Sequence, residues 1–369
     1  MVVDQVRTVK RGGTNIVGQV LEHGSCHEFA IRLTVIDWLK FRAVCAAWNR
    51  AAETALASGR RPRPEPPWLM LAGSTADPTT FDFFSFHDGR SRTASLPEPA
   101  IQRRIWIGSA HGWVVTADEE CALHLFNPVT GAQLPLPCIT TMGFFQALPR
   151  TKSGKATGFL FHESSFLAVH WPDRAFKERL CSMTACGALL VWEPDGEKFK
   201  SRIAVPEHNE GEEYVYFRKY LAESLDGDLV LICREHRSCY GGESDRSASD
   251  DDYTETDPTV RFQVFVLREG CQRSEWKELH DLGGAALFIG YNSAVFFPAD
   301  GIPNLLADYI YFTDDNLSIS WRNKQEPRDM GVFDMKNKMV KLMPSVDQHS
   351  NNWPPPIWVT PSIVDIVKA

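Results

Sequence analysis

The chain has 369 residues, of which 43% are hydrophobic and 23% are charged, a balance typical of a globular protein with a sizeable core. Its formal net charge is −8 and no basic face is evident, which disfavours nucleic acid as a partner. Nine scattered cysteines, with no signal-like or long apolar stretch, predict a reduced chain in the cytoplasm and/or nucleus, without a membrane partner.

The first part of the sequence predicts a small helical unit. Residues 1–30 form a divergent N-terminal segment of mixed character, and residues 31–58 have a helical pattern. Thr34 is a suitable N-cap for the first helix. The apolar residues that follow at mixed three- and four-residue spacings are Ile36, Leu39, Phe41, Val44 and Trp48.

Residues 59–67 mark a domain boundary. The stretch RRPRPEPP at residues 60–67 holds four prolines, which forbid a continued helix. We therefore predict a stiff, extended Pro/Arg-rich linker here, followed by a second domain over residues 68–369.

The second domain is predicted to be all-β and antiparallel. Short runs rich in aromatic and β-branched residues recur between Gly, Pro, Asp and Asn, and no long amphipathic helix separates them. The clearest runs are residues 68–72, 81–86, 113–117, 123–126, 166–171, 189–192, 229–233, 262–267 and 309–313.

A loose repeat organises these runs. A strand that ends in a polar turn with Gly or Asn recurs, as in FNPVTG (126–131) and VWEPDG (191–196), and a second strand usually follows. Repeats of about 40–50 residues with four strands each are typical of β-propeller blades. We expect about six blades, within a range of five to seven, and a β-sandwich with irregular loops is the alternative.

Three turn and edge segments have a predicted role. Asp226 and Gly227 suit a tight hairpin, and the side chains of Asp314, Asp315 and Asn316 can close a turn by bonding to the backbone. The segment WPPPIW at 353–358 suits an edge strand that ties the chain to an early blade and closes the ring.

An acidic segment interrupts the strand pattern at residues 241–258. It holds seven acidic residues and one arginine, a local charge of −6. We interpret it as a solvated, disordered insertion, whose serines and threonines beside acidic residues are possible phosphorylation sites. Calcium binding is disfavoured because residues 250–257 lack the glycine and the closing glutamate of a calcium loop.

The helical region carries a resemblance to a known motif. The stretch RLTVIDWLKFRAVCAAWNRAA at 32–52 resembles the second half of an F-box, matching at Leu33, Phe41, Arg42, Val44, Cys45 and Trp48. The resemblance implies helices that bind a Skp-type adaptor, which links them to a cullin scaffold. The residues expected to form this adaptor-binding patch are Leu33, Ile36, Leu39, Phe41, Val44, Cys45 and Trp48.

The C-terminal motifs carry a second resemblance. They follow in one order as 221–235, 261–267, 283–290, 309–316, 329–337 and 353–362. This series resembles plant F-box proteins of the KIB type, whose C-terminal part, a former domain of unknown function, is a kelch-like β-propeller. The resemblance spans residues 32–362 and implies the substrate-recognition subunit of a Skp-cullin-F-box ubiquitin ligase, which binds an unknown protein substrate.

Two other interpretations stay open. In the first, the F-box has decayed, because no Leu-Pro opening precedes it, and the propeller is a stand-alone scaffold. That interpretation expects residues 68–369 to fold and bind partners without residues 1–60. In the second, the propeller has an enzymatic or sugar-binding site at a central channel, which a convergence of carboxylates would favour.

No catalytic residue, metal site or cofactor is predicted from the residues themselves. A zinc site from Cys181, Cys186, Cys233, His236 and Cys239 has looser spacings than paired zinc ligands require. Ser109 and His111 lie close in sequence, but they do not form a G-x-S-x-G elbow. The chain is therefore expected to be a non-catalytic adaptor.

Overall fold

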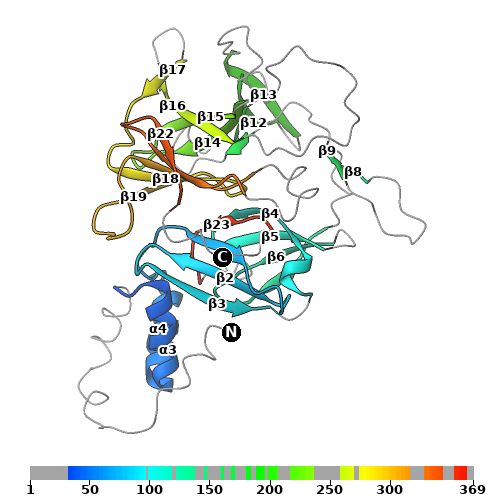
Figure 1. Ribbon diagram of the computed structural model, residues 1–369, viewed down its shortest axis with the longest axis vertical. Helices are drawn as coiled ribbons and strands as arrows, with labels where there is room; N and C mark the ends of the chain where they lie inside the picture. Colours follow the sequence, from blue (N-terminus) through cyan, green and yellow to red (C-terminus); the bar gives the residue numbers. More distant parts are fainter. Residues whose placement is uncertain are drawn as a thin grey trace.

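In the part of the chain that it describes, the computed structural model has two α-helices near the N-terminus, followed by a series of small sheets (Figure 1). The residues that it describes are 32–96, 99–118, 122–137, 145–147, 159–161, 168–170, 180–183, 188–195, 198–206, 217–236, 258–269, 274–315, 328–343 and 353–363. The divergent segment 1–30 and the acidic residues 241–257 lie outside this set, so the expectations for them stay predictions.

Two helices form a hairpin where helical structure was predicted. Helix α3 spans Val35–Val44 and helix α4 spans Ala46–Ala57, with an extended Cys45 between them. The Thr34 hydroxyl accepts a hydrogen bond from the Asp37 backbone N–H at 3.2 Å, which confirms the predicted N-cap.

Twenty-three strands follow the helices among the described residues. In the first half they are β1 Trp68–Ala72, β2 Thr80–Ser85, β3 Arg90–Ser95, β4 Ile105–Ala110, β5 Trp113–Ala117, β6 Leu123–Phe126, β7 Gln133–Pro135, β8 Phe145–Ala147, β9 Phe159–Phe161, β10 Ala168–His170, β11 Leu180–Met183 and β12 Leu189–Asp195. In the second half they are β13 Lys198–Val205, β14 Phe217–Glu223, β15 Leu229–His236, β16 Thr259–Glu269, β17 Ser274–Leu279, β18 Ala285–Ile289, β19 Val295–Pro298, β20 Tyr309–Phe312, β21 Gly331–Asp334, β22 Met339–Lys341 and β23 Ile357–Val359.

The strands make five blades of a β-propeller. Blade 1 has the order β23-β1-β2-β3, blade 2 is β4 to β7, blade 3 is β10 to β13 and blade 4 is β14 to β17. Blade 5 has five strands in the order β19-β18-β20-β21-β22, and β8 pairs with β9 in a separate two-stranded sheet. Five blades lie within the expected range of five to seven, and the sandwich alternative is wrong.

Most blades are built from antiparallel hairpins. The β14–β15 hairpin turns at Gly227, whose φ of 87° is a conformation that a side chain would oppose, as the Asp-Gly signal predicted. Blade 5 departs from this pattern because β18 pairs with β20 in parallel.

The ring closes as the sequence predicted for residues 353–358. Strand β23 pairs antiparallel with β1, with Leu69 opposite Trp358. The Trp358 indole N–H donates to the Ile289 carbonyl of blade 5 at 3.1 Å. The Trp358 backbone carbonyl accepts a hydrogen bond from the Ser109 hydroxyl of blade 2. One buried residue of blade 1 therefore contacts the blades on both of its sides.

The helical hairpin shares a hydrophobic core with blades 1 and 2. Trp38 and Phe41 belong to the same buried cluster as Trp68 and Phe83 of blade 1 and Trp106 of blade 2. The helices are therefore an integral part of the folded unit and pack directly on the propeller. Among the described residues, no helix has the length and apolar character to span a bilayer.

Replacing Trp358 with alanine tests this closure. The indole is fully buried, so its loss leaves a cavity and removes one of the two donors to the Ile289 carbonyl, the other being the Thr313 backbone N–H. We expect the free energy of unfolding to fall by about 3–5 kcal/mol in chemical denaturation. Trp276→Ala, at a half-buried tryptophan on the outer strand β17, is the control and should cost less. Equal losses in the two variants would contradict the closing role.

Candidate functional site

The predicted adaptor-binding patch divides into exposed and buried residues. Val44 is 60% exposed and Cys45 is exposed as well. Ile36 and Phe41 are only 6% and 3% exposed. The remaining three, Leu33, Leu39 and Trp48, are half-buried.

The buried part of the patch holds the helices together and against the propeller. Ile36 and Phe41 lie in the core that includes blade 1, and Phe41 also stacks on Trp48 with ring centroids 4.6 Å apart. While the hairpin is seated, these two residues have almost no surface to offer another protein. Ile36 and Phe41 therefore support the patch from its buried side. The surface that could contact another protein must come from the other predicted patch residues.

The exposed part lies at the junction of α3 and α4. Residues 43–47 are all exposed and have the sequence Ala-Val-Cys-Ala-Ala. The start of α3 contacts the propeller. A helix of ten residues is about 15 Å long, so the junction lies at the end of the hairpin that is distant from the propeller (Figure 1). An apolar tip that projects from a folded domain is suited to contact another protein.

Polar groups beside this tip brace the two helices. The Arg42 guanidinium donates to the Asn49 side chain at 2.9 Å and to Glu53 at 3.3 Å. The Asn49 amide also donates to Glu53 at 2.9 Å. This network joins α3 to α4 at partly exposed positions, so it orients the tip more than it stabilises the fold.

Glu65, in the predicted linker, couples the helices to blade 1. Its carboxylate accepts from the Val35 backbone N–H at 2.5 Å and from the Trp68 indole N–H at 3.3 Å. The Arg63 backbone N–H donates to the Leu33 carbonyl at 2.8 Å. The linker is therefore packed against both parts, and Glu65 occupies the N-terminus of α3, where a negative charge is favoured. Burial still raises the pKa of Glu65 above its usual value.

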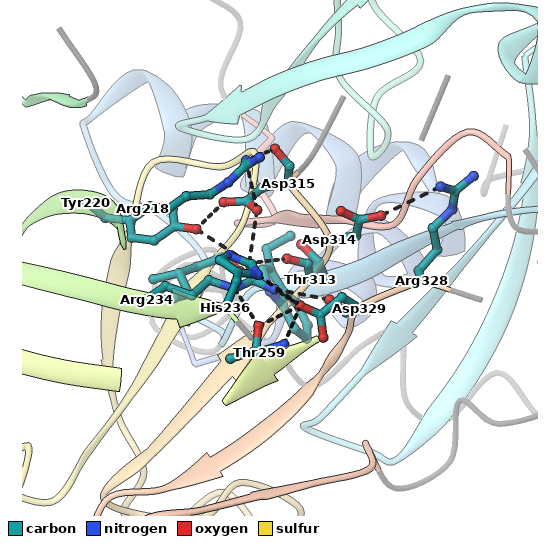
Figure 2. Close-up of polar contacts among 12 residues, drawn as sticks. Arg218, Tyr220, Arg234, His236, Thr259, Thr313, Asp314, Asp315, Arg328 and Asp329 are labelled. Carbon is teal, nitrogen blue, oxygen red and sulfur yellow. Dashed lines mark hydrogen bonds and ion pairs between the residues drawn. The ribbon is translucent and has the colours of Figure 1, made fainter. Parts of the chain in front are cut away.

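A second cluster of charged residues joins blades 4 and 5. Arg234 of β15 is fully buried at its centre and donates to the Thr313 carbonyl at 2.9 Å and to Asp329 at 2.9 Å (Figure 2). It also donates to the Thr259 hydroxyl at 2.8 Å and pairs with Asp315 at 3.2 Å. A buried guanidinium is stable only with such a complete set of acceptors.

Charge in this cluster is balanced between three arginines and three aspartates. Arg218 pairs with Asp315 at 3.0 Å, and Arg328 pairs with Asp314 at 3.6 Å. Burial disfavours the charged carboxylate of Asp315, but the guanidinium groups of Arg234 and Arg218 hold its pKa below the usual value. The Tyr220 hydroxyl also donates to Asp315, and burial beside this carboxylate raises the pKa of Tyr220.

This cluster bears on two predictions. The carboxylates of Asp314 and Asp315 pair with arginines distant in sequence, and the predicted turn that they form with Asn316 extends outside the described residues and stays a prediction. Carboxylates do converge here, as a channel site would require, but each one is paired with an arginine. Among the described residues, no group of His, Cys, Asp and Glu could hold a metal ion. The geometry is that of an interblade contact.

The other candidate residues are separated or engaged elsewhere. Cys181 and Cys233 are buried on strands of different blades, while Cys186 and Cys239 lie outside the described residues. The Ser109 hydroxyl donates to the Trp358 carbonyl, and nearby His111 is in a tight turn with a φ of 51°. These contacts give Ser109 a structural role.

Glu65 and Arg234 are the two important residues that sequence reasoning missed. Glu65 is the only acidic residue in the proline-rich linker, directly before the first strand, and this position was the available signal. Arg234 lies within a strand next to a long apolar run, and a charge in such a run needs a buried partner. Its partners Asp315 and Asp329 are far along the chain, so the pairing could not be read locally.

Replacing Glu65 tests the coupling of helices and propeller. Glu65→Ala leaves the Val35 N–H and the Trp68 indole N–H buried without an acceptor, so we expect a loss of about 2–4 kcal/mol in the free energy of unfolding. The matched control is Glu53→Ala, an exposed glutamate on α4, which should cost less than about 1 kcal/mol. An equal effect of both changes on urea midpoints would contradict the proposed role of Glu65.

Replacing Arg234 tests the interblade cluster. Arg234→Met leaves Asp315 and Asp329 without their central cation, and we expect a loss of about 3–5 kcal/mol at pH 7. Because the folded pKa of Asp315 is lowered, its stabilising contribution is present above the unfolded value near 3.8 and is lost as pH falls through the folded pKa. Chemical denaturation at pH values from 7 to 3 should therefore show a smaller fall in the free energy of unfolding for the variant than for the wild-type chain. The exposed pair Arg268–Asp228 supplies the control Arg268→Met, and a similar result there would contradict the assignment.

Comparisons with known proteins agree with this architecture. A profile of the family described as KIB1-4 beta-propeller matches residues 83–173 and 160–334. The F-box protein SKIP23 of Arabidopsis thaliana is 22% identical over 88% of this chain and 90% of its own length. The F-box protein KIB2 of the same plant is 22% identical over 40% of this chain and 33% of its own length.

The comparison with solved structures gives distant alignments, which carry no weight in the family assignment. A protein of unknown function from Bacteroides caccae aligns over 80% of this chain and 99% of its own, with 10% identity and a TM-score of 0.33. The family assignment rests on the sequence match to the five-bladed region and on the F-box relatives. The chain thus belongs to the KIB1-4 beta-propeller family and is a plant F-box protein with a KIB-type propeller.

Proposed function

We propose that this chain is the substrate-recognition subunit of a Skp-cullin-F-box ubiquitin ligase in the cytoplasm and/or nucleus. Its helical hairpin binds the Skp-type adaptor, and its propeller binds the protein target. The observation that carries this proposal is the exposed apolar tip at Val44 and Cys45, at the far end of a hairpin that is firmly packed on the propeller. The F-box relatives support it.

The exposure of the helical residues supports a narrower version of the proposed adaptor contact. Interfaces draw most of their energy from a few apolar side chains that become fully buried on binding. Val44 and Cys45 are open to such a contact, and half-buried Leu39 and Trp48 can extend it along the hairpin. Ile36 and Phe41 serve as the support that keeps the tip rigid.

The chain contributes geometry to the reaction, and the transfer chemistry belongs to partner subunits. A receptor increases the rate by holding the target close to the activated ubiquitin. Such positioning requires that the adaptor-binding end and the target-binding end move as one body. The Glu65 contacts and the core shared by Trp38 and Trp68 provide this connection.

One observation favours the alternative of a stand-alone scaffold. The burial of Ile36 and Phe41 shows that the helices have a packing role that does not need an adaptor. The same burial bears on one expectation of that alternative, because deleting residues 1–60 removes the helical part of the core that also holds Trp68 and Phe83 of blade 1. A point change at the exposed tip separates the two functions more cleanly than a truncation.

Val44→Asp tests the proposed adaptor contact. Placing a charge at the centre of an apolar interface should weaken adaptor binding by at least about ten-fold, while the melting temperature stays unchanged because the side chain is exposed. Binding of the purified full chain to a purified Skp-type adaptor can be measured by calorimetry.

The matched control is Leu225→Asp. Leu225 is 47% exposed in the β14–β15 turn, so it offers a similar side chain on another part of the molecule. We expect it to leave adaptor affinity unchanged. If the wild-type chain does not bind an adaptor that an intact F-box protein binds, the ligase role is wrong and the scaffold interpretation holds.

A further inference from the structure

The outer edge of blade 5 presents an exposed apolar surface. Residues 336–342, which include strand β22, are exposed without interruption and are called the β22 surface here. Met339 is 57% exposed, Val340 37% and Leu342 77%. Large apolar side chains rarely gather on the surface of a protein unless they contact something.

The hairpin that carries this surface is held rigid by Asp334. Its carboxylate accepts from the Lys336 backbone N–H at 3.1 Å, the Asn337 backbone N–H at 3.0 Å and the Asn337 amide at 2.8 Å. The Tyr309 hydroxyl and the Lys341 ammonium complete the set at 2.7 and 2.8 Å. A surface that is already ordered loses little conformational entropy when it binds a partner.

The β22 surface is basic, although the chain as a whole is acidic. Lys341 is neutralised by Asp334, but Lys336 and Lys338 are exposed and have no ion-pair partner within the described part of the chain. Two uncompensated positive charges therefore precede the apolar side chains on a protein with a net charge of −8. This combination favours a partner with apolar and acidic residues close together.

Strand β22 also has an open edge. It pairs with β21 on one side, and no other described strand pairs with its second side. Short edge strands with lysines are a common protection against unwanted pairing. Protection alone does not explain the adjacent Met339 and Leu342, which increase the tendency to associate. An extended peptide can use both features, through backbone hydrogen bonds and apolar side-chain contacts.

We propose that the β22 surface binds an extended peptide segment of the target protein, in which bulky apolar residues and a group of acidic residues occupy opposite ends. The peptide lies along the open edge of β22, its apolar side chains pack on Val340 and Leu342, which share one face of the sheet, and its acidic groups face Lys336 and Lys338 in the preceding turn. This inference rests on the proposed function, because it names the kind of target segment, but the peptide contact itself needs no adaptor.

A pair of labelled peptides tests the surface on the full-length chain. The first carries leucines in one half and glutamates in the other, and the second replaces each glutamate with lysine. Fluorescence anisotropy should show binding of the acidic peptide and at least ten-fold weaker binding of the basic one. Leu342→Asp, and separately Lys336→Glu with Lys338→Glu, should each weaken the acidic peptide by about ten-fold or more.

Ile203→Asp is the matched control, because Ile203 is 63% exposed on β13, the outermost strand of blade 3. It should leave the affinity unchanged. No binding of the acidic peptide, or equal binding of both peptides, overturns the proposal. Tighter binding by a chain that lacks residues 241–257 also overturns it, since the surface would then serve the chain's own acidic segment. Adaptor binding, measured separately, shows whether the proposed function stands when the peptide contact fails.

Discussion

The apolar face of the helical hairpin has to be buried against blade 1, and this constraint shapes the rest of the molecule. Trp38 and Phe41 fill the same core as Trp68 and Phe83, so the hairpin cannot turn freely on its linker. Its buried side is used for packing, and only its far end remains for contact with another protein. The propeller therefore determines which part of the F-box-like sequence is available.

Buried polar groups add direction to this packing. Apolar contact is not directional, whereas Glu65 fixes the helices through two specific hydrogen bonds. Arg234 does the same between blades 4 and 5, because its donors reach residues on both sides of the contact. In each case one buried charged side chain sets how two apolar units are oriented.

Much of the fold could be predicted from the sequence, because strand and turn signals are local. The run at 68–72 and the run at 113–117 match β1 and β5 at both ends, and the proline-rich segment before residue 358 correctly indicated an edge strand. The resemblance to the KIB type placed these elements in a propeller, and the match to that family agrees.

The candidate site was harder to predict, because burial depends on contacts between distant residues. Helical spacing placed Phe41 and Val44 in one patch, yet Phe41 is buried and Val44 is exposed. Neither the spacing nor the motif shows which side of a helix the propeller covers. For the same reason, the sequence could not show that the acidic pair at 314–315 has Arg218 and Arg328 as its partners.

The pairing of β1 with β23 has a consequence for how the protein is made. Strand β1 leaves the ribosome early, whereas β23 is synthesised after all the other described strands. Blade 1 therefore lacks one strand during most of translation, because Leu69 and Met70 cannot pair with Trp358 and Ile357 until those residues have been synthesised. Such long-range pairing slows folding and leaves an unpaired edge, so the nascent chain depends on protection from aggregation until synthesis reaches β23.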